Sequence, residues 1–210
     1  MLEKVAEFPS NILDAKVGQM KCFFFLNNYS SAINYSRIVI SEEKVQENTL
    51  IGAQVIIARS YLAMDSLTLA LQEFQVTSSA TQSEIGAESK YFMARIRYDQ
   101  GDLKGAEAEV FELVNRVPTY AFWIAKGLIL LSDVYVATED LFQAKATLQS
   151  ILDNYKGDET VLQEVRAKVT VVEELQKPKE KETIYEDIDV DFEGMDKMYD
   201  ELFEEELEDE

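Results

Sequence analysis

The chain has 210 residues, of which 40 are acidic and 20 basic, and it contains one cysteine and no histidine. Its formal net charge of −20 repels phosphate backbones and anionic lipid heads, so we expect protein or peptide partners and neither nucleic acid nor a membrane surface. Without histidine there is no Ser-His or Cys-His nucleophile pair and no imidazole metal ligand, which predicts a noncatalytic protein that needs no cofactor.

The first twelve residues have the pattern of the last turns of a helix. Leu2, Val5 and Phe8 follow one another at helical spacing, and Pro9 then stops the pattern. Two interpretations stay open for residues 1–12. They are the remnant of a preceding structural repeat, or they are a short N-terminal cap.

Residues 13–157 show a helical period throughout, with few glycines or prolines inside the apolar stripes and no alternating strand pattern. A small residue recurs in these stripes at intervals of 38, 36 and 38 residues, at Ala32, Ala70, Ala106 and Ala144. Three residues before each stand Tyr29, Leu67, Leu103 and Leu141. The recurrence predicts a repeat of two helices that cross closely at the small residue.

The third repeat has the clearest pattern, with Ala94, Tyr98, Gly101-Asp102-Leu103, Ala106, Leu113 and Pro118. This pattern resembles the tetratricopeptide repeat (TPR). The resemblance implies an all-α, right-handed solenoid of four helix-turn-helix units, over about residues 13–50, 51–86, 87–124 and 125–157. Three features depart from the family: the early tryptophan is missing, Arg97 replaces an aromatic residue, and the spacing exceeds 34 residues. The longer spacing resembles bacterial TPR proteins, and we expect the C-terminal part of a longer one.

Residues 158–177 are predicted to form a capping helix, and residues 178–210 an acidic, largely disordered tail. The helix prediction starts from Asp158-Glu159-Thr160, which places acidic side chains in a first turn. The fold is expected to end at Pro178, because the segment from Lys179 to Glu210 carries 16 acidic and 3 basic side chains.

The TPR resemblance implies a peptide-binding groove lined by the first helix of each unit. The predicted groove residues combine cations with aromatic and apolar side chains: Lys21, Phe24, Arg59, Leu62, Tyr91, Arg95 and Tyr98. Such a surface suits an extended peptide with acidic side chains or a free carboxylate. The alternative is that these are ordinary surface cations, some of them paired with Glu88 and Asp99. The residues do not match the carboxylate clamp of chaperone-binding TPR domains, so no chaperone partner is inferred.

The tail contains a second candidate interaction segment. Its apolar side chains fall at helical spacing among Asp and Glu, at Met195, Met198, Tyr199, Leu202 and Phe203. This pattern predicts an amphipathic helix that forms on a partner. Because its charge is opposite to that of the predicted groove, the tail is also a candidate ligand of the groove in its own or a neighbouring chain, which would give self-association.

A different hypothesis treats the tail as a calcium-responsive or tail-switched regulatory module. Residues 189–200 approximate a calcium loop, with Asp189, Asp191, Glu193, Gly194 and Asp200 at positions 1, 3, 5, 6 and 12. Glu at position 5, Asp at position 12 and the lack of a second loop depart from that pattern. Diffuse cation binding is the alternative.

Two further features concern packing and compartment. Trp123 with Tyr120 and Phe122 is expected to pack between repeats, and the neighbouring phenylalanines predict a buried Cys22. Apolar runs are far below the roughly 18 residues of a membrane span, and Met1-Leu2-Glu3-Lys4 does not begin a signal peptide. A complete chain would therefore be cytoplasmic, whereas a fragment of a longer secreted protein leaves the periplasm open.

Overall fold

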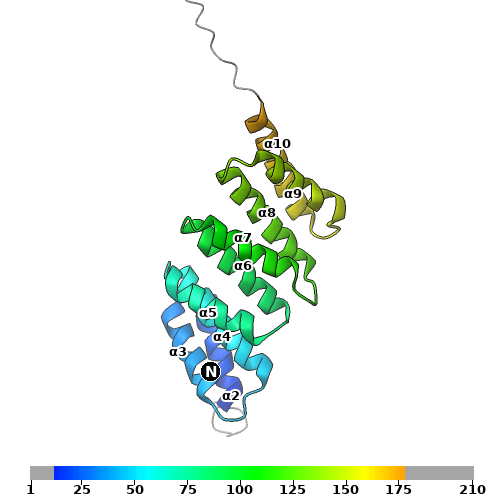
Figure 1. Ribbon diagram of the computed structural model, residues 1–210. Helices are drawn as coiled ribbons and strands as arrows, with labels where there is room; N and C mark the ends of the chain where they lie inside the picture. Colours follow the sequence, from blue (N-terminus) through cyan, green and yellow to red (C-terminus); the bar gives the residue numbers. More distant parts are fainter. Residues whose placement is uncertain (1–11, 178–210) are drawn as a thin grey trace, which may run out of the picture. The chain divides into compact units, whose positions relative to one another are not determined.

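The computed structural model describes residues 12–177, and every regular element in this range is an α-helix (Figure 1). The helices are α2 (Ile12–Phe25), α3 (Tyr29–Ser41), α4 (Glu47–Ala63), α5 (Leu67–Ala80), α6 (Glu84–Asp99), α7 (Leu103–Val114), α8 (Ala121–Ala137), α9 (Leu141–Asn154) and α10 (Glu159–Gln176). The predicted fold class is confirmed: helices pack consecutively into a helical-repeat solenoid.

Each of the first four helix pairs is closed by the same kind of turn. One residue in each turn has a positive φ, namely Asn27 (58°), Asp65 (55°), Gly101 (79°) and Glu139 (62°). The next residue is the N-cap of the following helix, and its side chain accepts a backbone hydrogen bond in three of the four turns. Asp102 and Asp140, for example, accept hydrogen bonds at 3.0 Å from the backbone N–H groups of Gly105 and Gln143. The Gly101-Asp102 dipeptide is thus the least strained version of a turn that occurs in all four hairpins.

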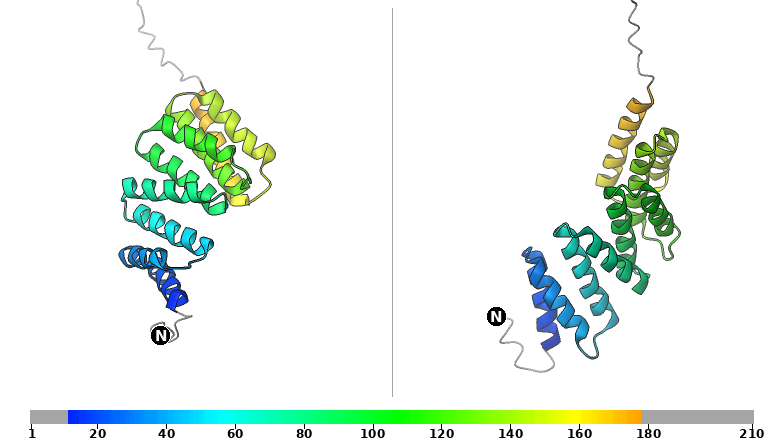
Figure 2. Two further views of the ribbon diagram at one scale, coloured as in Figure 1. Left: turned by 60° about the horizontal axis from the view of Figure 1, so that its bottom comes forward. Right: turned by 60° about the vertical axis from the view of Figure 1, so that its left-hand side comes forward.

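The helices form two sets, which we call A helices (α2, α4, α6 and α8) and B helices (α3, α5, α7 and α9). Each helix packs against its neighbours in the chain, and each A helix also contacts the next A helix. α10 packs against both α8 and α9, so it takes the place of a further A helix. Both views of Figure 2 show this succession from the blue α2 to the orange α10.

The core is a series of apolar clusters, with the recurring alanines at the crossings of A and B helices. Ala32, Ala70, Ala106 and Ala144 are completely buried. Around them pack larger side chains such as Met20, Phe74, Val110 and Leu148, each almost wholly buried. A side chain larger than alanine at these four positions would force the helices apart, because interiors have no free volume to receive it.

Two details differ from expectations. Cys22 is exposed, not buried. Met20 fills the core, while Cys22 lies on another side of α2, because successive residues turn by about 100° around a helix. The predicted repeat boundaries at 51, 87 and 125 also fall inside α4, α6 and α8, because aligning the alanines sets the register of the repeats without setting the ends of their helices.

No helix within residues 12–177 combines the length and the apolar character that crossing a lipid bilayer requires.

Candidate functional site

The A helices present a row of charged and aromatic side chains that we call the A-helix face: Lys21, Phe24, Arg59, Tyr91, Arg95, Lys126 and Asp133. The row exists because the ninth position of each predicted unit recurs on the same side of its helix, at Lys21, Arg59, Arg95 and Asp133. These side chains line two hollows, one between α2 and α4 and one among α6, α8 and α10.

The hollow between α2 and α4, called the first pocket here, has a volume of about 380 Å³. It is lined by Lys21, Phe24 and Phe25 of α2 and by Gly52, Val55, Ile56 and Arg59 of α4. Three predicted groove residues, Lys21, Phe24 and Arg59, therefore come together at one place. Its walls are apolar and its charged groups are cations, which suits a ligand that has a carboxylate next to an apolar side chain.

Arg59 also forms an ion pair with the next A helix. Its Nε and Nη2 atoms donate to the two carboxylate oxygens of Glu88 at 2.7 and 2.5 Å. Glu88 is only 6% exposed, so the guanidinium compensates a nearly buried carboxylate. Arg59 thus both lines the first pocket and links α4 to α6.

The hollow among α6, α8 and α10 is small, about 40 Å³, and its lining is dominated by charged side chains. Tyr91 and Arg95 of α6 line it together with Lys126, Asp133 and Glu164. The Arg95 Nε donates to Asp99 at 2.9 Å, and the Asp99 carboxylate raises the pKa of Arg95 above its ordinary value. A space of this size accepts a water molecule but not a peptide side chain.

Two ion pairs join α8 to α10 at the end of the row. Lys126 donates to Glu164 at 2.8 Å, and Lys168 donates to Asp133 at 2.5 Å. Both α8 residues belong to the A-helix face, so α10 already supplies their partners. Arg59 and Arg95 are thus paired with Glu88 and Asp99, as the alternative interpretation of ordinary surface cations predicted. Among the predicted groove cations, Lys21 alone has no ion-pair partner within residues 12–177.

The remaining predicted groove residues have packing contacts. Leu62 packs against the core cluster around Phe74, and Tyr98 packs against the cluster around Val110. Neither lines the two hollows of the A-helix face. The sequence pattern overlooked Gly52 and Lys126. Both occupy the second position of their units, as Glu88 does, and that shared position was the available signal.

Arg97 replaces the aromatic residue that the TPR resemblance implies, and the structure shows what it contributes. It donates to Asp102 at 2.9 Å and to Glu109 at 3.2 Å. Glu109 also accepts from the buried Lys90 at 2.7 Å. This polar network joins α6 to α7, where an aromatic side chain would otherwise pack.

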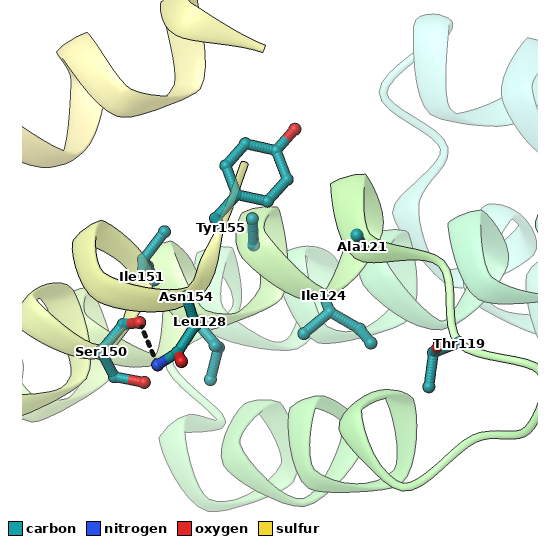
Figure 3. Close-up of a pocket in the computed structure, with 9 residues that line it drawn as sticks. Thr119, Ala121, Ile124, Leu128, Ser150, Ile151, Asn154 and Tyr155 are labelled. Carbon is teal, nitrogen blue, oxygen red and sulfur yellow. Dashed lines mark hydrogen bonds between the residues drawn. The ribbon is translucent and has the colours of Figure 1, made fainter. Parts of the chain in front are cut away.

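A separate pocket of about 300 Å³ lies between α8 and the end of α9 (Figure 3). Ile124, Leu128, Ile151 and Tyr155 form its apolar lining, and the Asn154 side chain at its edge donates to the Ser150 carbonyl at 2.9 Å. The pocket holds no charged side chain, so it offers apolar contact without a group that would select a ligand.

The aromatic residues around Trp123 pack between repeats. The Trp123 ring lies 5.5 Å from Tyr91 and 6.1 Å from Phe92, measured between centroids. Phe92 in turn stacks on Phe74 of α5 at 5.2 Å. The contacts join α5, α6 and α8, as expected for inter-repeat packing.

Within the described residues no group of three or more acidic or cysteine side chains is placed to hold a metal ion. The predicted calcium loop of residues 189–200, the tail residues Met195, Met198, Tyr199, Leu202 and Phe203, and the segment of residues 1–11 all lie outside the described range.

Comparisons with known proteins agree on the fold. Residues 16–99, less than half of the chain, match the family model of the coatomer epsilon subunit, a TPR-like α-helical repeat family. The crystal structure of BtubC (BKLC) from P. vanneervenii is similar with a TM-score of 0.67 and 14% identity, over 82% of this chain and 79% of that chain. At that identity the likeness concerns the fold alone. No curated protein sequence matches the chain.

Proposed function

We propose that the protein is a noncatalytic helical-repeat scaffold that binds protein or peptide partners through its A-helix face. The observation that supports this most directly is the first pocket, in which Lys21 and Arg59 stand beside Phe24 and Phe25. Cations next to apolar walls suit charge-assisted hydrogen bonds combined with burial of a side chain, the usual basis of peptide recognition.

The likeness to the coatomer epsilon subunit family supports the same class of function, because a coatomer subunit works within a protein assembly. A helical-repeat fold by itself leaves the partner open, since repeat surfaces differ from one protein to the next. We infer the chemistry of the partner from the pocket: an extended segment with acidic and apolar side chains. The acidic tail is proposed as a second interaction segment of the scaffold.

The proposal is tested by comparing two exposed phenylalanines. Phe25 lines the first pocket and is 79% exposed, whereas Phe142 on the B helix α9 is 76% exposed and lines none of the pockets described above. Each is replaced in turn by the photoreactive residue p-benzoylphenylalanine in the full chain, which is then irradiated in an extract of its source cells. We expect discrete cross-linked proteins at position 25 and none of them at position 142. Equal cross-linking at both positions would contradict the proposal.

A further inference from the structure

Residues at the second and ninth positions of the predicted units form ion pairs that connect α4 to α6 and α8 to α10. Arg59, at the ninth position of the second unit, pairs with Glu88, at the second position of the third. At the other end of the row, Lys126 and Asp133 hold these two positions in the fourth unit, and both pair with α10. Between α6 and α8 these positions hold two cations, Arg95 and Lys126, which line one small hollow together with Asp133 and Glu164 and pair with other carboxylates.

The first junction, between α2 and α4, has no such ion pair among the described residues. Lys21 has the ninth position of the first unit, and the residue opposite it in α4, at the second position, is Gly52. Where the third unit has a glutamate, the second has no side chain at all. A Cβ atom built on Gly52 would meet no heavy atom within 4 Å, so the space is open. Lys21 is exposed and has no carboxylate partner within residues 12–177.

The region of the first junction is also the least acidic part of the chain that the structure describes. Residues 12–63 carry five basic and four acidic side chains, a net charge of +1. Residues 64–177 carry 11 basic and 18 acidic side chains, a net charge of −7, and the segment from Lys179 to Glu210 has a net charge of −13. An acidic segment is therefore repelled least by the region of α2 to α4, where Lys21 and Arg59 supply local positive charge.

We propose that the first pocket is the binding site of the acidic C-terminal segment, residues 194–207, with a carboxylate of that segment in the space beside Gly52 and against Lys21. The segment has the matching chemistry, because Met195, Met198, Tyr199, Leu202 and Phe203 alternate with Asp and Glu at helical spacing. The pocket offers apolar side chains for them to pack against, at Phe24, Val55 and Ile56. This inference deepens the proposed function and rests on it, since it assigns one ligand to the A-helix face.

The chain supplies its own probe for a test in the full-length protein. Cys22 is exposed, stands next to Lys21 and is the only cysteine in the sequence, so a nitroxide spin label can be attached there without a substitution. Backbone NMR then compares the paramagnetic and diamagnetic states of the 210-residue chain. We expect the signals of residues 194–207 to lose intensity in the paramagnetic state, and to recover at about 1 M salt, where the screening length falls to about 3 Å.

Three variants decide whether the first pocket is responsible. Gly52→Glu places a carboxylate where the third unit has Glu88, and Lys21→Glu reverses the charge, so both should abolish the intensity loss. Lys104→Glu makes the same charge change on the exposed side of α7, away from the first pocket, so it should retain the loss. Circular dichroism confirms that each variant is folded. Mixing labelled and unlabelled copies shows whether the segment comes from the same or a neighbouring chain.

The proposal is overturned if the tail signals of the wild-type chain are unchanged, or if their loss persists in both Gly52→Glu and Lys21→Glu. This failure is distinct from a failure of the proposed function. Cross-links of other proteins at position 25, absent at position 142, would then still support the scaffold, and the first pocket would be free for a foreign ligand.

Discussion

Arg59 and Glu88 join the second and third repeats through two parallel hydrogen bonds, of 2.7 and 2.5 Å, between a half-exposed guanidinium and a nearly buried carboxylate. A bidentate ion pair fixes the relative position of α4 and α6 along the A-helix face, because both donor atoms must align with both acceptor atoms. The pair therefore holds Arg59, one of the residues that line the first pocket, in a fixed position against α6.

Replacing Arg59 by Met should destabilise the fold, because the Glu88 carboxylate then stays buried without a partner. We expect the free energy of unfolding to fall by about 1–3 kcal/mol, with partial recovery in the double variant Arg59→Met, Glu88→Met. Urea denaturation measures both. Arg95→Met is the matched control, since its partner Asp99 is exposed and such a pair contributes about 0–1 kcal/mol. Equal losses at the two positions would show that burial of the carboxylate is not the cause.

The four similar turns give a prediction about backbone strain. Glu139 has a φ of 62°, which costs a residue with a Cβ about 1 kcal/mol, whereas Gly101 adopts 79° freely. Glu139→Gly should therefore raise the midpoint of thermal unfolding, and Gly101→Ala should lower it. Gly52→Ala, in the middle of α4, should raise it as well, by removing glycine flexibility from the unfolded chain. Scanning calorimetry of the three variants checks the signs, and a gain in Gly101→Ala would contradict the prediction.

Overpacking tests the recurring alanines. Ala144 is fully buried where α9 crosses its neighbours, and Ala146, two residues later, is exposed. Ala144→Leu should lower the free energy of unfolding by about 1–3 kcal/mol, because the helices must move apart to admit the larger side chain. Ala146→Leu should change it by less than about 0.5 kcal/mol. The comparison uses denaturant unfolding, and similar effects of both substitutions would refute close crossing at Ala144.

The Lys90 network predicts a dependence on alkaline pH. Burial alone would lower the pKa of Lys90, but hydrogen bonds and charges of Glu109 and Glu112 outweigh it, and the pKa lies above its ordinary value of 10.5. A lysine whose pKa is raised on folding stabilises the protein fully below the pKa of the unfolded state and loses this effect as the pH rises through that of the folded state.

Lys90→Met should therefore destabilise the fold near neutral pH by about 1–3 kcal/mol, since Glu109 keeps only Arg97 as a partner. The difference between wild type and variant should shrink once the pH exceeds about 10.5. Urea titrations at several pH values from neutral to strongly alkaline measure the difference directly, and the variant corrects for all other titrating groups. A difference that does not change with pH would exclude titration of Lys90 as the cause.

The architecture was accessible from the sequence because its signals are periodic. Ala32, Ala70, Ala106 and Ala144 recur at nearly constant intervals, and each must be small for the same steric reason. The Gly101-Asp102 turn could also be recognised, since a glycine followed by a helix-capping acidic residue is a local sequence signal for a turn. Asn27, Asp65 and Glu139 adopt the same conformation without glycine, so their turns could be inferred only by alignment with the third repeat.

The pairing of the charges was less accessible, because it depends on which side chains face each other between helices. Arg59 reaches Glu88 29 residues away, and a periodic pattern does not reveal such a contact. Leu62 and Tyr98 recur at the same position of their units as Phe24, but they pack against the core. The A-helix face therefore includes fewer positions of each unit than the sequence pattern predicts. The prediction that Cys22 is buried was wrong, because it relied on the apolar residues next to Cys22 in the sequence, and adjacent residues point to different sides of a helix.

The contacts between helices link each one to helices one or two places away in the chain, and none of these contacts joins α2 to α10. The helices at either end of such a solenoid can unfold locally while the middle helices stay folded, because the packing of each helix depends only on helices close to it. Amide hydrogen exchange should then be fastest at the two terminal hairpins and slowest near α5 and α6. Since the first pocket lies between α2 and α4, a ligand there would hold together one of the two ends at which unfolding starts.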